Sequence, residues 1–425
     1  MDRNLLKSVL YEYTVEIPKY VVNHRDIRFE EMGNYVFVGM RRAGKSYILY
    51  QRMQELLAKG VKPHEMLYIN FEDERLAGME TRDLNLLLET HLEMHGVRPI
   101  LFLDEVQNVS GWEKFARRLA DTKYRVYISG SDAKMLSADI QTTLGGRYFV
   151  VDVYPYGFKE YLTANDIDFS SNAIMSTQGR AAILKEFNDY FRFGGLPECV
   201  MLSLKRDYLN SVYQKIYLGD IAGRNPVSNL LALRVLFKKL AESIKQPISY
   251  NRIANVVSST GVKISVNTVI NYIEYAKDAW LISTIQNITG KLVDKETAPK
   301  YYFTDNAILN LFLLDGNTSL LENVVAVNLL RKYGRNDAVY FYNKGIEVDF
   351  YIPDTYTAIQ VCYNLDNSDG TFDREVKALL KITEVLECRK LQIITRDTEE
   401  RILKMNGKEI EVVPVWKWLL NEANE

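Results

Sequence analysis

The sequence predicts an α/β protein that begins with a parallel sheet covered by helices on both faces. Short apolar runs alternate with amphipathic stretches over about 120 residues, which is typical of buried parallel strands joined by helices. Three of the apolar runs end in loops that carry glycine, serine or acidic side chains. Because ligands bind at the carboxyl ends of such strands, the three loops predict one shared site.

Each element of this sheet has its own pattern. The first helix, for example, places Ile48, Leu49 and Met53 at the spacing of one helical face. The predicted strands are residues 35–38, 66–71, 100–103, 125–128 and 149–153, and the predicted helices are residues 46–57, 81–95 and 112–120. The three loops that follow strands are residues 39–46, 104–105 and 129–131.

Length and composition limit the possible classes of protein. A chain of 425 residues is too long for one hydrophobic core, so we expect two to four domains. A net charge of −2 gives no general attraction to nucleic acid or anionic membrane, and any such binding must come from a local patch.

Cysteine usage and the distribution of apolar residues indicate the compartment. The three cysteines are far apart and odd in number, which argues against a disulfide framework and fits a reducing cytoplasm. Residues 1–20 have scattered charges and no apolar core of a signal peptide. No run approaches the roughly 18 apolar residues of a membrane span, so we expect a cytoplasmic protein without a membrane partner.

Residues 39–46 read Gly-Met-Arg-Arg-Ala-Gly-Lys-Ser and match the phosphate-binding loop pattern of nucleotide-binding proteins. The glycines allow backbone N–H groups to curl around phosphate oxygens, and the helix N-terminus adds partial positive charge. Lys45 is expected to reach the β- and γ-phosphates of ATP, and the Ser46 hydroxyl to ligate Mg²⁺. The predicted nucleotide-binding residues are Gly39, Arg42, Ala43, Gly44, Lys45 and Ser46.

The two acidic residues after the third strand complete the chemistry of hydrolysis. Asp104 is expected to hold Mg²⁺, directly or through water, and Glu105 to act as general base on the attacking water. At the end of the next strand, a hydroxyl of Ser129 or Ser131 could orient that water. The sequence does not separate the two serines, and a turn-capping role is an alternative for both.

Arg147 follows two glycines just before the fifth strand. Its guanidinium could stabilise charge on the transferring phosphoryl group, in its own chain or from a neighbouring subunit of a homo-oligomer. The alternative is an ordinary surface arginine. Arg41 and Arg42, inside the loop, could also contact phosphate or point to solvent.

The rest of the chain changes character three times. Residues 156–235 are largely helical, with a turn at residues 193–198. Residues 247–304 have a winged-helix pattern, in which Ser249 and Ser265 cap two helices and residues 280–284 and 301–303 could form the wing. The last segment alternates helix and strand and predicts a small mixed α/β domain.

His91 and His95 are four apart on a predicted helix. The zinc-binding pattern of metalloproteases needs a glutamate directly after the first histidine, and Leu92 stands there instead. We therefore expect a solvated or partly buried pair and no zinc site.

Several segments together resemble a known family, the bacterial and archaeal AAA-type ATPases that carry a C-terminal domain of unknown function. The resemblance extends over nearly the whole chain. It is carried by residues 39–46, 68–76, 102–112, 129–131, 146–147, 154–160, 194–198, 300–305, 322–323 and 347–350.

The resemblance implies an ATPase module, a winged-helix-like middle and a restriction-endonuclease-like end. In that nuclease fold, acidic residues and a lysine hold Mg²⁺ and position water. Glu322, Asp349 and Gln360 occupy the acidic places here, and Cys362 stands at the lysine place. A thiol does not replace an ammonium beside phosphate, so this end is interpreted as a degenerate nuclease fold whose activity is lost.

The resulting prediction has four domains. They are an AAA-type ATPase domain (1–155), a helical lid or linker (156–235), a winged-helix-like domain (236–304) and a degenerate endonuclease-like domain (305–425). The leading functional hypothesis is a Mg²⁺-dependent ATPase that acts as a switch or machine on a macromolecule. The alternatives are an ATP-dependent DNA-processing nuclease and a non-catalytic DNA-binding module, and either DNA or a protein could bind through residues 247–304.

Overall fold

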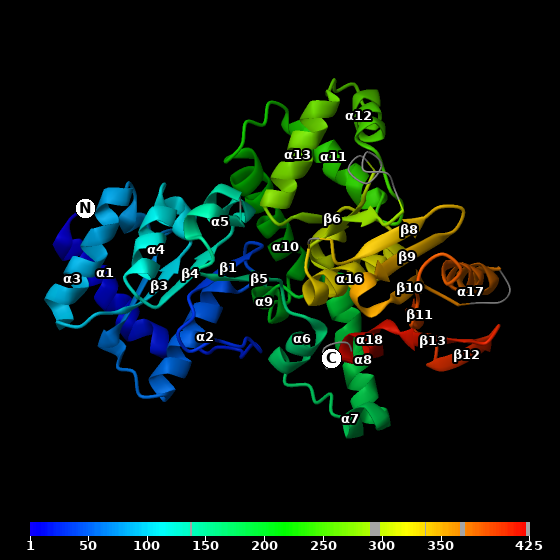
Figure 1. Ribbon diagram of the computed structural model, residues 1–425, viewed down its shortest axis with the longest axis horizontal. Coiled ribbons are helices and arrows are strands. Elements are labelled where there is room, and N and C mark those ends of the chain that lie inside the picture. The colour runs from blue at the N-terminus through cyan, green and yellow to red at the C-terminus, as the bar shows by residue number, and fades with distance from the viewer. Residues whose placement is uncertain (137, 290–297, 336, 366–369, 422–425) are drawn as a thin grey trace. The chain divides into compact units, whose positions relative to one another are not determined.

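The computed structural model describes residues 1–136, 138–289, 298–335, 337–365 and 370–421. Part of the winged-helix-like segment, residues 290–297, lies outside the described residues. The chain forms two compact units (Figure 1). The first unit is Met1–Tyr154 with Asp278–Trp280, and the second is Pro155–Lys277 with Leu281–Glu425.

The first unit is built on a sheet of five strands, all paired in parallel. Strand order is β2-β3-β4-β1-β5, so the carboxyl ends of β3, β4 and β1 are consecutive along one edge. This confirms the predicted parallel sheet and places its three loops side by side. The strands are β1 (Tyr35–Gly39), β2 (Met66–Asn70), β3 (Ile100–Asp104), β4 (Val126–Gly130) and β5 (Phe149–Val153).

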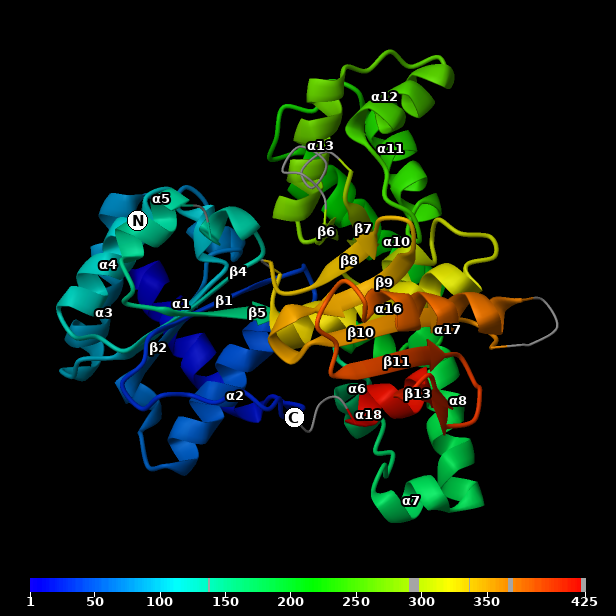
Figure 2. The ribbon, with the colours of Figure 1, turned by 45° about the vertical axis from the view of Figure 1, so that its right-hand side comes forward.

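Helices cover both faces of this sheet. Helix α2 packs against β1, β3 and β4, while α4 and α5 lie on the opposite face (Figures 1 and 2). Helix α1, which the sequence analysis did not identify, packs on β2 and α3 and buries Leu6, Val9 and Leu10. The helices are α1 (Arg3–Glu16), α2 (Lys45–Ala58), α3 (Leu84–His95), α4 (Trp112–Asp121) and α5 (Ala138–Leu144). Short 3₁₀ turns are η1 (Ile17–Lys19), η2 (Pro63–Glu65), η3 (Glu74–Leu76), η4 (Thr81–Asp83), η5 (Val106–Asn108) and η6 (Ala133–Leu136).

His91 lies buried on α3, with the ring of His95 4.8 Å away between centroids. Burial, together with the neighbouring His95, lowers the pKa of His91 to about 4. The unfolded chain therefore takes up this proton first as the pH falls. Among the described residues, no group of three or more histidine, cysteine or acidic side chains is placed to hold a metal ion.

The free energy of unfolding is expected to fall as the pH drops from about 6.5 to about 4, by at most about 3 kcal/mol from this residue. A His91→Leu variant removes that contribution, so its stability relative to the wild type should rise between pH 7 and pH 4 in urea unfolding. Leu92→Ala, at an exposed, non-titrating position of the same helix, is the control and should leave the slope unchanged. Identical pH slopes for wild type and His91→Leu would contradict this assignment.

The second unit begins with helices, as predicted for residues 156–235. The two predicted caps are also present. Ser249 Oγ accepts from the Arg252 amide at 3.3 Å, and Ser265 Oγ accepts from the Thr268 amide at 3.1 Å. The helices are α6 (Phe158–Ala164), α7 (Ser171–Met175), α8 (Thr177–Phe193), α9 (Pro197–Val200), α10 (Lys205–Gln214), η7 (Lys215–Ala222), α11 (Leu230–Glu242), α12 (Tyr250–Ser259) and α13 (Val266–Asp278).

A mixed sheet of eight strands follows, in the order β12-β13-β11-β10-β9-β8-β6-β7 (Figure 2). Strands β6 and β7 form an antiparallel pair, and β6 also pairs with β8. The hairpin expected as a wing is thus the edge of this larger sheet. The strands are β6 (Ile282–Asn287), β7 (Lys300–Phe303), β8 (Tyr340–Asn343), β9 (Glu347–Ile352), β10 (Thr357–Cys362), β11 (Lys390–Thr395), β12 (Arg401–Met405) and β13 (Lys408–Pro414).

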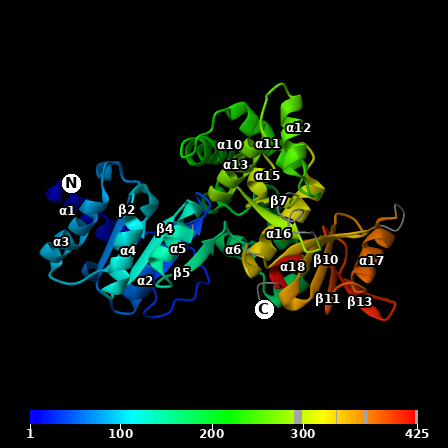
Figure 3. The ribbon, with the colours of Figure 1, turned by 45° about the horizontal axis from the view of Figure 1, so that its top comes forward.

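This sheet separates two layers of helices. Helices α16 and α18 lie on one face and α17 on the other (Figures 1 and 3). The mixed α/β prediction is confirmed, while the finer division of residues 156–425 into three domains stays a prediction. The remaining helices are α15 (Asn306–Leu309), α16 (Asn317–Tyr333), η8 (Pro353–Thr355), α17 (Thr371–Ile382) and α18 (Val415–Asn421).

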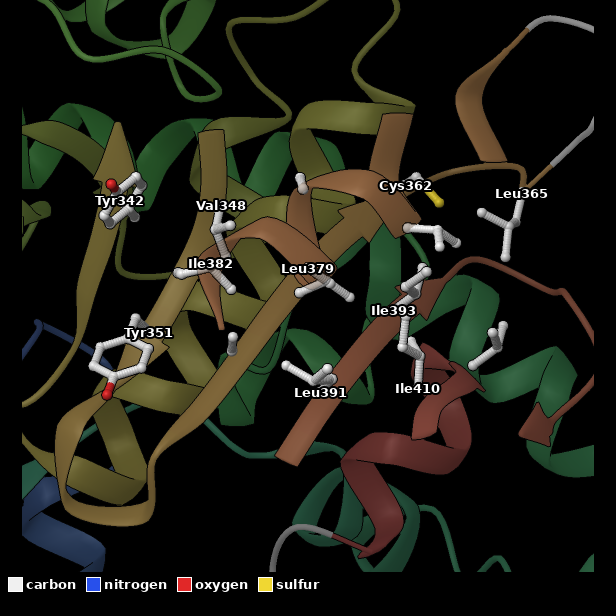
Figure 4. Packing of buried hydrophobic residues seen from close by; sticks show 14 residues of the cluster. Tyr342, Val348, Tyr351, Cys362, Leu365, Leu379, Ile382, Leu391, Ile393 and Ile410 are labelled. Atoms are coloured by element: carbon white, nitrogen blue, oxygen red, sulfur yellow. The ribbon is translucent and has the colours of Figure 1, made fainter. Parts of the chain in front are cut away.

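An apolar cluster packs α17 onto the sheet (Figure 4). Leu379 and Ile382 of the helix meet Leu391 and Ile393 of β11 in this cluster. Cys362 belongs to the same cluster and is 7 % exposed. The residue at the expected lysine position is therefore part of a hydrophobic core.

Asp305 connects two of the segments that carry the family resemblance. Its carboxylate accepts from the Gly195 amide at 2.9 Å and from the Ala307 amide at 2.7 Å. A Cβ at Gly194, whose φ is +67°, would stand 1.6 Å from Asp305 Oδ1. Glycine is therefore needed in the turn at residues 193–198 because the carboxylate occupies the space beside it.

No helix among the described residues has both the length and the apolar character needed to cross a bilayer.

Candidate nucleotide-binding site

The loop of residues 39–46 joins β1 to α2. Gly44 has φ +93° and is the N-cap of α2, a left-handed conformation that glycine adopts without strain. The Ala43 amide donates to the Met40 carbonyl at 3.2 Å and closes the turn. A Cβ at Gly39 would lie 2.0 Å from the Val153 carbonyl oxygen, so close packing against β5 also requires glycine there.

Lys45 is the first residue of α2 and is 4 % exposed. Its ammonium donates to the carbonyl oxygens of Gly39 and Met40, both at 3.1 Å. Glu105 Oε1 lies 3.6 Å from the same nitrogen. The lysine is therefore held inside the loop by groups that a phosphate oxygen can replace.

Asp104 ends β3 and is fully buried. The Tyr68 hydroxyl donates to Oδ2 at 2.6 Å, and the Ser129 hydroxyl donates to Oδ1. Burial, together with the charge of Glu105, raises the pKa of Asp104, while hydrogen bonds from Ser129, Tyr68 and Ser46 act in the opposite direction.

Glu105 has φ +51°, a left-handed conformation that is strained for a residue with a side chain. Its Oε2 accepts from Ser131 Oγ at 2.9 Å and from the Gln107 amide, and its own amide donates to Ser129 Oγ at 3.2 Å. Burial raises the pKa of Glu105, but Lys45 and the hydrogen bonds outweigh it, so the net pKa is lowered. The carboxylate is thus ionised and aimed at Lys45.

The two serines left unseparated in the sequence therefore have different neighbours. Ser129 binds Asp104, and Ser131 binds Glu105. For Mg²⁺, Ser46 and Asp104 offer a hydroxyl and a carboxylate, and the Ser46 hydroxyl acts to lower the pKa of Asp104. Oxygen donors of these two kinds fit Mg²⁺.

The arginines of the loop occupy different environments. Arg41 donates to Glu72 Oε1 at 3.0 Å, and Arg42 is exposed with φ +65°. Arg25, which the sequence analysis did not consider, donates to the Ala43 carbonyl at 3.2 Å and to the Tyr154 carbonyl at 3.1 Å. It thereby ties the loop to the segment that follows β5.

Arg147 precedes β5, whose other end, Val153, pairs with Gly39. Its side chain binds Asp121 and the carbonyls of Leu144 and Gly145. Arg147 is therefore at the amino edge of the sheet, and the structure does not bring it to the loop within one chain. A contribution from a neighbouring subunit stays a prediction.

Sequence reasoning missed two tyrosines at the site. Tyr68 lies on β2, next to β3, and Tyr50 lies on α2, with 3.2 Å between their hydroxyl oxygens. Burial raises the pKa of Tyr68 well above its usual value, and Asp104 adds to this, so its hydroxyl remains a donor. The available signal was its position near the carboxyl end of a predicted strand.

Comparisons with known proteins agree with this geometry. A family model described as an AAA domain matches residues 33–162, and one described as a domain of unknown function matches residues 184–336. An uncharacterized protein of Methanocaldococcus jannaschii is 34 % identical over 433 residues, which cover 97 % of this chain and 96 % of that protein.

Two further similarities come from more distant proteins. An uncharacterized protein of Haemophilus influenzae is 29 % identical over 394 residues, covering 91 % of this chain and 94 % of that protein. Among solved structures, a Walker-type ATPase of Pyrococcus abyssi has 15 % sequence identity and a TM-score of 0.39. The matched region covers 73 % of this chain and 95 % of the Pyrococcus abyssi chain.

Proposed function

The chain belongs to the family of AAA-type P-loop ATPases that carry a separate C-terminal domain of unknown function, and on that premise we propose that it hydrolyses ATP to drive a macromolecular partner. The observation that carries the proposal is the meeting of Lys45, Asp104 and Glu105 at one edge of the sheet. A site for binding alone would not need the ionised Glu105 beside the phosphate-binding lysine.

Each side chain has a role in this proposal. The loop amides and Lys45 hold the β- and γ-phosphates, and Ser46 and Asp104 hold Mg²⁺, which neutralises phosphate charge when bound. Glu105 accepts the proton of the attacking water. Ser131 orients Glu105 and the water, and Ser129 and Tyr68 orient Asp104.

The direct test is phosphate release by the purified chain with ATP and Mg²⁺. We expect turnover that requires both and that ends when Mg²⁺ is chelated. Absence of turnover, alone and in the presence of DNA or cell extract proteins, would rule the proposal out.

Tyr68→Phe is expected to reduce turnover roughly 10-fold and to raise the Mg²⁺ concentration needed for half-maximal turnover. The ring stays in place, but Asp104 loses a hydrogen bond worth about 1.5 kcal/mol or more because its acceptor is charged. Tyr47→Phe is the matched control, since Tyr47 lies on α2 and is 48 % exposed. Unchanged Mg²⁺ dependence in Tyr68→Phe would remove this positioning role.

For the partner, we propose the surface of α12 and α13. Both helices begin at a serine cap, and Asn267 and Asn271 are exposed one turn apart on α13. Such amides suit base edges or a protein surface equally. A gel shift that weakens steeply with salt identifies DNA, whereas salt-resistant capture of a protein identifies the other class.

A homo-oligomer is proposed together with a role of Arg147 between subunits. Size-exclusion chromatography in the presence of ATP tests the oligomeric state. The Glu105→Gln variant is used because it should hydrolyse ATP slowly, and a monomer under these conditions would argue against the oligomer.

A further inference from the structure

A group of acidic side chains lies in the second unit, whereas the candidate nucleotide site belongs to the first. Glu322 of α16, Glu347 and Asp349 of β9 and Gln360 of β10 line a pocket of about 540 Å³. In the endonuclease-like interpretation of the sequence, Glu322, Asp349 and Gln360 stand at the places that hold Mg²⁺. The contacts of the pocket allow that assignment to be tested.

Lys300 of β7 occupies the centre of the group. Its side chain is fully buried, and its ammonium lies 3.2 Å from Glu322 Oε1, 3.2 Å from Glu347 Oε1 and 3.1 Å from Asp349 Oδ1. An ammonium has three N–H donors, and here three carboxylates surround it. Tyr302, two residues along β7, donates to the same Glu322 oxygen at 2.8 Å.

Two further oxygens of the group are also engaged. Asp349 Oδ2 accepts from the Val361 amide at 2.9 Å, and Gln360 Oε1 accepts from the Asp349 amide at 2.9 Å. The Gln360 amide nitrogen donates to the Glu347 carbonyl at 3.0 Å. The atom of Gln360 that would bind Mg²⁺ is thus committed to the backbone of β9.

These contacts do not fit a resident divalent cation. A metal such as Mg²⁺ needs several oxygens at about 2.0–2.1 Å from one point, and the lysine nitrogen stands at that point. In agreement, no group of three or more acidic, histidine or cysteine side chains in the described part of the chain is arranged around a metal position.

We propose that the Lys300 ammonium has taken the place of the metal ion in this endonuclease-like site, so that the site is closed to divalent cations. Burial lowers the pKa of Lys300, but the carboxylates of Glu322, Asp349 and Glu347 outweigh burial and raise it, so the ammonium persists. The inference goes beyond ATP hydrolysis and does not depend on it. For the interpretation of this end as an inactive nuclease fold, the added cation at Lys300 is a second reason beside the missing one at Cys362.

The test is Mn²⁺ binding to the nucleotide-free full chain, followed by electron paramagnetic resonance. The wild type is expected to bind no Mn²⁺ at this pocket. Lys300→Met keeps the length of the side chain, removes the charge and leaves three carboxylates facing a space that a metal ion can enter. It should bind one equivalent of Mn²⁺ that the wild type does not bind.

Two further variants locate the ion. Adding Asp349→Asn to Lys300→Met should abolish binding, since it removes a ligand. Lys245→Met is the matched control, because Lys245 lines the same pocket but is exposed, and it should bind no Mn²⁺. Binding by the wild type that depends on Asp349, or no binding by Lys300→Met, would overturn the proposal.

If Lys300→Met does not fold, a second variant still tests the proposal. Lys300→Met with Glu322→Gln removes one positive and one negative charge, so the core carries less uncompensated charge, and Glu347 and Asp349 remain as ligands. Its melting temperature should rise with Mn²⁺, whereas that of the wild type should not. An unchanged melting temperature in the double variant contradicts the proposal.

Discussion

Lys45→Ala is expected to lower ATP turnover by about 10²-fold or more and to weaken nucleotide binding. The lysine is buried inside the loop, where its ammonium donates to the Gly39 and Met40 carbonyls. Alanine leaves the loop backbone in place but removes the positive charge that meets the β- and γ-phosphates. Phosphate release and titration with a fluorescent ATP analogue measure the two effects separately.

The matched control for this variant is Lys59→Ala. Lys59 is the C-cap of the same helix α2 and is exposed. It should retain wild-type turnover and binding. Wild-type turnover in Lys45→Ala, with an unchanged melting temperature, would mean that the loop of residues 39–46 is not the catalytic phosphate site.

Glu105→Gln is expected to reduce turnover by about 10²- to 10⁴-fold while nucleotide binding is kept. The amide has nearly the shape of the carboxylate and can still accept from Ser131, but it cannot take a proton from water. Removing the negative charge 3.6 Å from Lys45 also leaves that lysine freer to meet phosphate. Affinity for the ATP analogue should therefore be equal or higher.

Single-turnover measurements separate these effects from product release. Glu31→Gln, at an exposed glutamate of the same unit, is the control and should behave as the wild type. A Glu105→Gln variant that hydrolyses ATP at the wild-type rate would exclude the residue as general base and direct attention to water held by Ser131.

The nucleotide loop was predictable because its function is encoded locally. Spacing alone sets the curled backbone of residues 39–46, and an apolar run followed by Asp104 and Glu105 marks the end of a buried strand. The adjacency of these loops followed from the parallel sheet. Both features depend on short segments of chain that fold in the same way in many contexts.

The contacts of Tyr68 and Lys300 were missed for the opposite reason. Each side chain contacts residues on neighbouring elements. Which residues it contacts depends on the register of the strands and on segments far along the chain. The ammonium of Lys300 meets carboxylates 22 and 49 residues away. Nothing in the local pattern of β7 distinguishes this lysine from one that points to solvent, so only the folded sheet identifies its partners.

The pairing of the β6–β7 hairpin with the rest of the sheet was not predictable from its local pattern. Alternating apolar residues after two capped helices are typical of a winged helix, and the pattern does not say which strand lies next to it. Strand β6 pairs with β8, more than 50 residues away in sequence. This pairing is determined by the tertiary structure and not by the local sequence.

The place of β6 and β7 in the large sheet has a consequence for how such a chain can be recombined. A module that begins after residue 304 would lack β6 and β7. Strand β8 would then have an unpaired edge, and the acidic pocket would lack Lys300. A module that begins at Leu281 keeps the whole sheet, but it loses the helices of residues 155–277, which belong to the same compact unit and contact it through Gly195 and Asp305. We expect natural or engineered chimaeras of this architecture to be joined before the hairpin and not after it.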